Sequence, residues 1–321
     1  KVDITADVAE EEKKRDLPAT VQRLLALIAN KTPPIIKICE ETKESQDCHW
    51  ELPPGSVFDL YRGGKKSLAL HERGVELIKD ISSDEKLTDN QVVQREVALT
   101  GKPHVNKQEI TTFLKQLTHP LSYLDFETFN NGIPPFDGTR PYQAIPFQYS
   151  LHIVDEEGTE SRHVSYLYKG TSDPRKEFIE HLRNNLPTTG TIIVYNQSFE
   201  MGKLRDLALA YPEHAEWVAD ALKRIIDLLE PFKNFNYYNP AQQGSNSIKA
   251  VLPAMTGKGY EDLEIADGDT ASIEYVRVTY GTVTDEERAR VYTALEEYCG
   301  RDTMAMVEVV RELRKMVSTE R

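Results

Sequence analysis

The chain of 321 residues is long enough for one large domain or two ordinary ones, and its three cysteines exclude a disulfide-rich scaffold and favour a reducing, cytoplasmic compartment. A formal net charge of −13 argues against a protein that coats nucleic acid by bulk electrostatics, because cationic contacts drive phosphate binding. No apolar run is long enough to cross a bilayer and no signal peptide is visible at the start, so we expect no membrane partner.

Residues 1–118 are predicted to form a smaller, mostly helical lead-in region. The sequence begins at Lys1 without an initiating methionine, so we expect a fragment whose true N-terminus is missing. Up to about Lys31 it is charged and then helical in pattern, with an apolar part made of Leu24, Leu25, Leu27 and Ile28. The pattern further predicts a strand at residues 35–38, a turn at the Pro-Pro-Gly of 53–55, and short helices at 66–81 and 107–117.

Residues 119–321 are predicted to form the second and larger domain. Strands are expected near 121–128, 145–154, 162–169 and 191–196, with helices at 174–186, onward to about 232, and at the C-terminus. Strands first, followed by a strand flanked by helices, is the order typical of a mixed sheet with helices on both faces. The predicted fold class is therefore α/β.

The segment from Leu121 to Phe129 places two carboxylates on one face of a strand. Side chains alternate across a strand, so Tyr123, Asp125 and Glu127 share one face. Such a pair repels itself unless a cation, a shared proton or solvent intervenes, and Mg²⁺ prefers oxygen ligands of this kind. An edge strand with a solvated face is the alternative.

A second carboxylate position follows the apolar run TIIVYN at 191–196. This run has the character of a buried parallel strand, and Asn196 is a candidate cap for the helix that follows. A ligand site at the carboxyl edge of the sheet would bring Glu200 near Asp125. The alternative is that Glu200 serves only the helix macrodipole.

The terminal helical pattern, from about Asp285 to Val317, carries a carboxylate inside an apolar stripe. The stripe consists of Val291, Leu295, Tyr298, Met306, Val309, Leu313 and Met316. Asp302 fills its one gap, four residues after Tyr298 and four before Met306. A charge that faces a core must be paired, protonated or bound to metal. Alternatively, Gly300 interrupts the helix and lets Asp302 reach water.

The ordered set DFE, NQSFE and YCGRD resembles the three exonuclease motifs of the DEDD superfamily, in its tyrosine-bearing subgroup. The resemblance implies a ribonuclease H-like fold, with Asp125, Glu127 and Asp302 as metal ligands. It implies that Tyr298 orients the attacking water, since an unperturbed phenol with a pKa of about 10 is a poor base. Glu200 stands where the family has aspartate, which either reshapes the second metal position or marks a divergent, less active branch.

Three flanking phrases extend the resemblance, namely GTRPYQAIPFQYSLHIV, SIKAVLPAM and DLEIADGDTA. They are similar to an uncharacterised prokaryotic family of predicted exonucleases. That family is often joined to a nuclease module of the CRISPR-adaptation type, which has a restriction-endonuclease-like fold and a cysteine-bound iron–sulfur cluster. The resemblance implies a covalently joined N-terminal nuclease module that is absent from this chain.

Cys39, Cys48 and His49 allow two interpretations. They are candidates for the remains of that cluster site. However, a metal site needs about four ligands and their spacing matches no common zinc pattern, which favours free cysteines.

The expected function is that of a metal-dependent 3′–5′ exonuclease that hydrolyses DNA or RNA with two Mg²⁺ or Mn²⁺ ions. Single-stranded 3′ ends are the expected partner, and Asp125, Glu127, Glu200, Tyr298 and Asp302 are the expected catalytic residues. The alternatives are a nuclease-fold binding or scaffold module with weak catalysis and a phosphodiesterase acting on small nucleotides.

The expected substrate contacts are Phe129, Arg140, Asn196 and Phe199. Aromatic rings stack on bases in single-strand binders, although core packing is the alternative for Phe199. Further candidates for phosphate contacts are Lys169, Lys203, Arg205 and Lys249, against the alternative of solvated surface charges.

Overall fold

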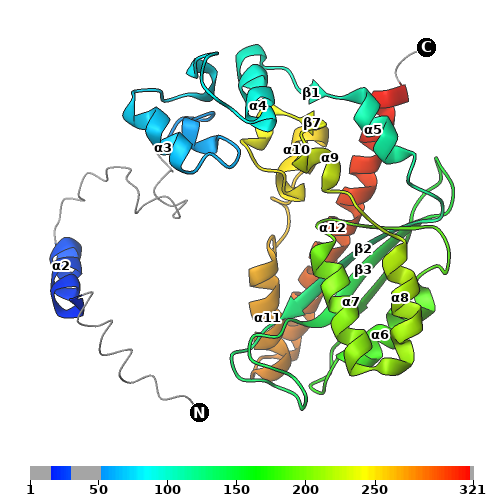
Figure 1. Ribbon diagram of the computed structural model, residues 1–321. Coiled ribbons are helices and arrows are strands. Elements are labelled where there is room, and N and C mark those ends of the chain that lie inside the picture. The colour runs from blue at the N-terminus through cyan, green and yellow to red at the C-terminus, as the bar shows by residue number, and fades with distance from the viewer. Residues whose placement is uncertain (1–15, 30–51, 319–321) are drawn as a thin grey trace.

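The computed structural model describes residues 16–29 and 52–318 (Figure 1). The predicted strand at 35–38 and the residues Cys39, Cys48 and His49 lie outside the described residues. The predicted first helix is present as α2 (Leu17–Ala29), and the side chains of Leu24 and Leu25 are exposed. Among the described residues, no helix combines the length and the apolar character that crossing a bilayer requires.

A five-stranded mixed sheet forms the centre of the fold, with the strand order β4-β3-β2-β5-β6. The strands are β2 (Leu121–Phe129), β3 (Ile145–Val154), β4 (Arg162–Leu167), β5 (Thr191–Val194) and β6 (Ile225–Asp227). Strands β2, β3 and β4 pair antiparallel to one another, whereas β5 pairs in parallel with both β2 and β6. This is the predicted ribonuclease H-like mixed sheet.

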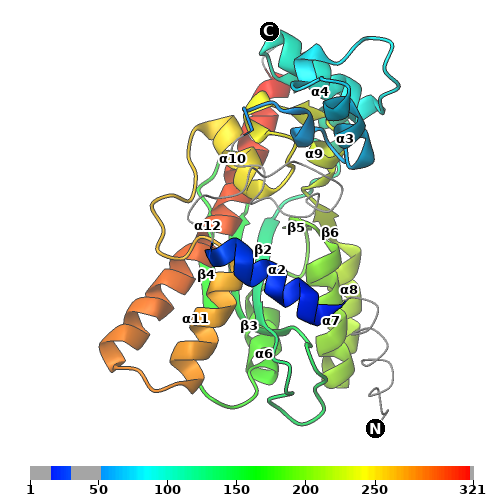
Figure 2. The same cartoon turned by 90° about the vertical axis from the view of Figure 1, so that its left-hand side faces the viewer.

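Two layers of helices cover the sheet (Figure 2). One layer consists of α6 (Arg175–Asn185), α7 (Ser198–Ala210) and α8 (Ala215–Lys223). The other contains α5 (Lys107–Leu114), α10 (Ile248–Thr256), α11 (Gly268–Tyr280) and α12 (Asp285–Ser318). Alternation along β2 creates this division, because Leu124 and Phe126 pack in the first layer and Tyr123 packs in the second.

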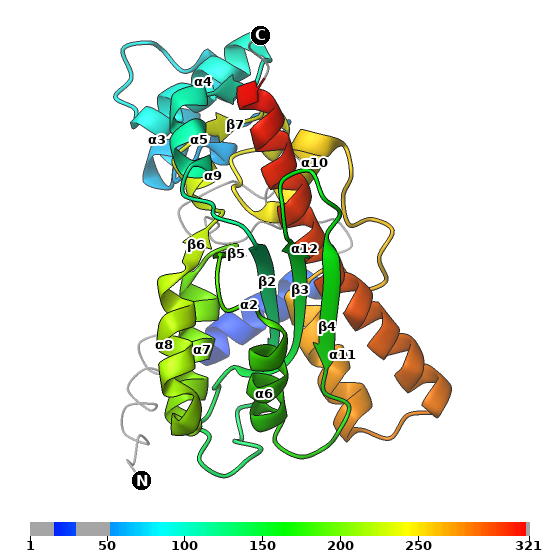
Figure 3. The same ribbon diagram turned by 90° about the vertical axis from the view of Figure 1, so that its right-hand side faces the viewer.

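The terminal helix α12 runs unbroken for 34 residues and crosses the sheet behind β3 and β4 (Figure 3). Its predicted apolar stripe is confirmed, since all members except the half-buried Met316 are buried. The interpretation that Gly300 interrupts this helix is wrong. Asp302 therefore remains inside the stripe, where it faces the sheet.

The lead-in region is mostly helical, as predicted. It contains η3 (Val57–Asp59), α3 (Lys65–Glu72), η4 (Ile78–Asp80), α4 (Asp89–Thr100) and β1 (His104–Val105). The single helix predicted at 66–81 is divided into α3 and η4, because Gly74 adopts a φ of 82°. The sequence prediction missed α4, whose N-terminus is fixed by a capping box between Thr88 and Gln91.

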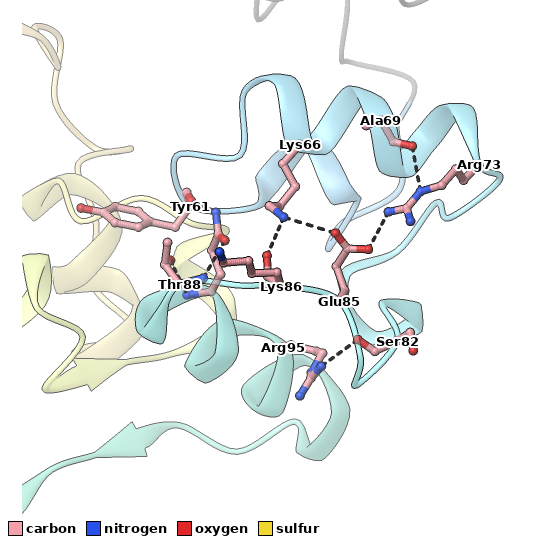
Figure 4. Close-up of polar contacts among 10 residues, drawn as sticks. Tyr61, Lys66, Ala69, Arg73, Ser82, Glu85, Lys86, Thr88 and Arg95 are labelled. Carbon is pink, nitrogen blue, oxygen red and sulfur yellow. Dashed lines mark hydrogen bonds and ion pairs between the residues drawn. The ribbon is translucent and has the colours of Figure 1, made fainter.

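Charged contacts hold the lead-in region together (Figure 4). Glu85 accepts from Lys66 at 3.2 Å and from Arg73 at 2.7 Å, and these two hydrogen bonds lower the pKa of its carboxyl group. Arg95 donates to the Ser82 carbonyl at 2.9 Å. The network ties α3 and α4 to the loop between them.

The lead-in region also packs on the segment that follows β6. That segment contains α9 (Glu230–Lys233), β7 (Tyr237–Tyr238) and η6 (Pro240–Gln242), and β1 pairs with β7. Gln94 donates to the Tyr238 hydroxyl at 3.2 Å, while α5 packs against α12. Contacts such as these cross the predicted domain boundary between residues 118 and 119. The division of the chain into two domains at that point therefore stays a prediction.

Two leucines on α7 provide a test of the layer arrangement. Leu204 is buried, whereas Leu209 on the same helix is 81% exposed. We expect Leu204→Ala to lower the free energy of unfolding by about 2–5 kcal/mol, because it removes buried methyl groups and leaves a cavity. Leu209→Ala should change it by less than about 0.5 kcal/mol. Urea denaturation of both variants measures the difference, and equal effects would contradict the arrangement.

Candidate metal-binding active site

Asp125 and Glu127 project from the middle of β2 toward α12, as the alternation predicted. They pair across the sheet with Ser150 and Gln148 of β3. Glu127 is buried and Asp125 retains some solvent contact. The Gln148 side chain donates to the Leu295 carbonyl at 2.8 Å, which fixes α12 against this face of the sheet.

The helix α12 supplies Tyr298 and Asp302, both buried and one turn apart. Asp302 accepts a hydrogen bond from the Tyr260 hydroxyl at 2.7 Å. Tyr260 lies in the loop between α10 and α11. The core-facing carboxylate thus has a phenol donor, which the sequence interpretation did not anticipate.

Glu200, near the start of α7, is only 2% exposed, and its Oε2 atom has no hydrogen-bond partner. A carboxylate that served the macrodipole alone would remain in water. Burial and the nearby Asp125 both raise the pKa of Glu200. The side chain therefore reaches the same space as Asp125.

Asp227, at the end of β6, holds the loop that presents Glu200. Its carboxylate accepts from the backbone N–H groups of Asn196 at 2.8 Å, Gln197 at 3.1 Å and Leu229 at 3.0 Å. The expectation that Asn196 caps α7 is wrong, because Asn196 lies one residue before the N-cap and adopts a φ of 73°. Asp227 instead binds the backbone N–H groups of Asn196 and Gln197, the two residues that precede α7.

All four carboxyl groups of this cluster have raised pKa values. Burial is the largest cause for each. Mutual repulsion adds to it, since Asp302 raises the pKa of Asp125, and Asp125 raises those of Glu127 and Glu200. Such a cluster lacks positive charge, and a bound cation would supply it.

Lys249 and Cys299 also line the cluster. The Lys249 ammonium donates to the Tyr298 hydroxyl at 3.0 Å and to the Ala266 carbonyl at 2.6 Å. The Cys299 sulfur lies 3.8 Å from Asp125 Oδ2, and burial followed by the repulsion of Asp125 raises the pKa of its thiol. The thiol is therefore neutral.

The donor set fits a hard divalent cation. Ligand atoms of Asp125, Glu127 and Cys299 lie within 4.8 Å of one another. Glu200 lies close enough to Asp125 for their charges to repel, and one of its buried oxygens has no hydrogen-bond partner. Carboxylate oxygens suit Mg²⁺ and Mn²⁺, whereas a neutral thiol is a poor ligand. Asp125, Glu127, Glu200 and Asp302 are thus the residues that would hold the ions.

Unlike the carboxylates, the predicted substrate contacts lie partly in the aromatic core and partly at exposed positions. Phe129 is fully buried among aromatic rings, including Phe147 and Tyr275, so its ring belongs to the core. Phe199 is 38% exposed, so its ring is accessible to a ligand, whereas Glu200 next to it in sequence is buried. Asn196 and Arg140 are exposed, with Arg140 in the loop between β2 and β3.

Of the other candidate cations, only Lys249 contacts the cluster through a hydrogen bond. Lys169 pairs with Glu296 at 3.2 Å and Lys203 pairs with Asp206 at 3.2 Å. Arg205 is exposed. These positions agree with the alternative of surface charges for all three.

The sequence interpretation gave no role to three residues of the site, Tyr260, Asp227 and Cys299. Cys299 was within reach, because it follows Tyr298 directly in the motif. Tyr260 and Asp227 act through partners 42 and about 30 residues away in sequence. No local pattern reports contacts of that separation.

Comparison with known proteins gives partial matches without an assigned function. A family model described as a domain of unknown function, DUF2779, matches residues 122–247. The match includes Asp125, Glu127 and Glu200 and ends before Lys249, Tyr298 and Asp302. No solved structure gives a significant match.

Three uncharacterised proteins from mycoplasmas and a ureaplasma are similar to the chain. Uncharacterized protein MG366 of Mycoplasma genitalium is 27% identical over 61% of this chain and 32% of its own length. Its Mycoplasma pneumoniae homologue is 25% identical over 64% and 34%, respectively. Uncharacterized protein UU173 of Ureaplasma parvum is 26% identical over 61% and 31%. The chain thus spans about a third of the length of these relatives.

The raised pKa of Glu200 makes the stability of the metal-free protein depend on pH. Between the ordinary and the raised pKa, the folded state binds more protons than the unfolded state, so stability falls as pH rises. Glu200→Gln removes this group, and we expect it to stabilise the metal-free protein at pH 8 by about 0.5–2 kcal/mol. Urea denaturation at pH 5 and pH 8 measures the effect.

The matched control is Glu96→Gln, on the exposed face of α4, which should leave the pH dependence unchanged. Excess Mn²⁺ should restore the stability that the wild-type protein loses as pH rises. A Glu200→Gln variant that is equally or less stable at pH 8 would contradict an electrostatically strained cluster.

The Asp227 carboxylate provides a separate prediction about the loop that carries Glu200. We expect Asp227→Asn to lower the free energy of unfolding by about 1–3 kcal/mol, because an amide N–H₂ would face buried backbone donors. Asp155→Asn, just after β3, breaks only an exposed ion pair with Arg162 and should cost less than about 1 kcal/mol. Equal unfolding midpoints for the two variants would argue against the bracing role.

Proposed function

We propose that this chain is a metal-dependent 3′–5′ exonuclease that hydrolyses phosphodiester bonds at single-stranded ends of DNA or RNA. The observation that carries the proposal is the convergence of four carboxylates from β2, α7 and α12, among which one buried oxygen of Glu200 has no hydrogen-bond partner. The order of these residues along the chain supports it, since it resembles that of the DEDD exonuclease motifs. The 3′–5′ direction rests on that resemblance.

Two bound cations would activate water and stabilise the leaving oxygen. Asp125, Glu127 and Asp302 would hold one cation, and Glu200 would act on the second together with Asp125. Glu200 is one methylene longer than the aspartate of the resembled motif. Its burial against Asp125 supports a ligand role despite that difference.

Tyr298 has the properties of a proton donor that positions other groups. Burial and the adjacent Asp302 raise the pKa of its phenol, so the hydroxyl stays protonated at neutral pH. A protonated phenol cannot accept a proton as a base, but it can donate a hydrogen bond to the attacking water or to a phosphate oxygen. This supports the role of Tyr298 as an orienting residue.

An exposed aromatic ring on the helix that carries Glu200 supports action at the end of a strand rather than on a long duplex. This ring is Phe199, with the Lys203 ammonium 5.8 Å from its centroid. An aromatic face beside a cation is the type of element on which a terminal base stacks. Such local contacts are compatible with the overall acidic charge.

The relatives are about three times as long as the region that they share with this chain. The proposal includes a covalently joined nuclease module on the N-terminal side. Such a module would act on the nucleic acid before or after the exonuclease step.

Digestion of 5′-labelled single-stranded DNA and RNA with Mg²⁺ or Mn²⁺ tests the proposed activity. We expect a stepwise ladder from the wild type and from the Glu96→Gln control. Asp125→Asn should lower the rate by at least about 10²-fold, because it removes a ligand oxygen shared by both cations. The assay also identifies the polymer.

Other products would exclude specific parts of the proposal. Immediate release of a labelled mononucleotide would indicate the opposite direction, and cleavage of circular single strands would indicate an endonuclease. Turnover of dinucleotides alone would support a small-nucleotide phosphodiesterase. Mn²⁺ binding by calorimetry without any turnover would support a binding or scaffold module.

A further inference from the structure

Lys249 stands at a position that its own helix disfavours. It is the second residue of α10, whose N-terminus is capped by the Ser247 side chain. The positive end of the helix macrodipole repels a cation there, and α10 has no acidic residue in its first turn to compensate. Local helix stability therefore does not explain a lysine at this position.

Tertiary contacts fix the Lys249 side chain against the carboxylate cluster. Its ammonium donates to the Ala266 carbonyl at 2.6 Å and to the Tyr298 hydroxyl at 3.0 Å. The same nitrogen lies 4.8 Å from the centroid of the Tyr298 ring. A lysine with two acceptors and an aromatic face has one orientation, unlike a solvated surface lysine.

The contact with Lys249 determines what the Tyr298 hydroxyl can do. An ammonium group has only donors, so the phenol oxygen must accept from it. The single phenol proton then points away from Lys249. Asp302 already accepts from the Tyr260 hydroxyl at 2.7 Å. The contact with Lys249 therefore sets the direction in which the Tyr298 hydroxyl can donate.

We propose that Lys249 is a positioning residue of the hydrolytic site, which aims the Tyr298 hydroxyl at the attacking water or the scissile phosphate. The inference rests on the proposed function. Lys249 acts through Tyr298 and does not itself touch the reacting atoms. Without the Lys249 ammonium, the Tyr298 phenol could rotate its proton toward Ala266 or solvent. The attacking water would then lose the hydrogen-bond donor that holds it in place.

A double-mutant cycle with Tyr298 tests this role. Lys249→Met keeps much of the side-chain length and removes the donor. We expect it to lower kcat about 10- to 100-fold with little change in KM, the range typical of residues that orient a metal-site group. Tyr298→Phe should have a similar effect. Because the two act as one unit, the double variant should be no slower than the slower single variant.

Two controls separate positioning from a general loss of charge or fold. Lys258→Met, in the loop after α10, breaks only the exposed pair with Glu308 and should leave kcat and KM unchanged. Lys249→Arg retains donors and should recover part of kcat. Calorimetry should show that Lys249→Met binds Mn²⁺ at least as tightly as the wild type, since a repelling cation has been removed.

The outcomes distinguish this inference from the proposed function. If the losses of Lys249→Met and Tyr298→Phe multiply in the double variant, or if KM alone rises, Lys249 acts on the substrate directly and the positioning role is wrong. A fully active Lys249→Met variant would overturn it as well. A wild type without turnover on any phosphodiester would overturn the proposed function and the inference together.

Discussion

Four carboxyl groups share one buried space, and their mutual repulsion is the constraint around which this fold is arranged. The space is bounded by the centre of β2, the start of α7 and the middle of α12. Each of these elements is held by contacts outside the cluster, such as the bond from Gln148 to the Leu295 carbonyl. The packing energy of the core therefore holds together groups that would otherwise separate.

The same constraint explains the polar neighbours of the cluster. Without cations, charge is offset by Lys249 and by the hydrogen bond from the Tyr260 hydroxyl to Asp302. Glu200 lacks even this compensation, since one of its oxygens has no partner. A site that leaves one buried oxygen unsatisfied is less stable than an apolar core of the same size. Such a loss of folding stability is typical of binding sites.

Local sequence patterns predicted the parts of the site that lie on regular elements. Alternation along β2 placed Asp125 and Glu127 together, and the stripe of α12 placed Asp302 opposite them. The parts of the site that these patterns missed, such as Tyr260 and Asp227, depend on contacts between segments that are distant in sequence. The three-residue strand β6, predicted as helix, is too short for either periodicity to appear, and propensity alone does not locate such elements.

The left-handed backbone of Asn196 restricts which amino acids this position can accept. Its φ of 73° is required for the turn that brings two successive N–H groups to Asp227. Asparagine and glycine adopt this conformation readily, whereas β-branched residues do so at considerable strain. Across diverging chains of the same fold, this position should therefore be restricted to residues that readily adopt a left-handed backbone, chiefly asparagine and glycine.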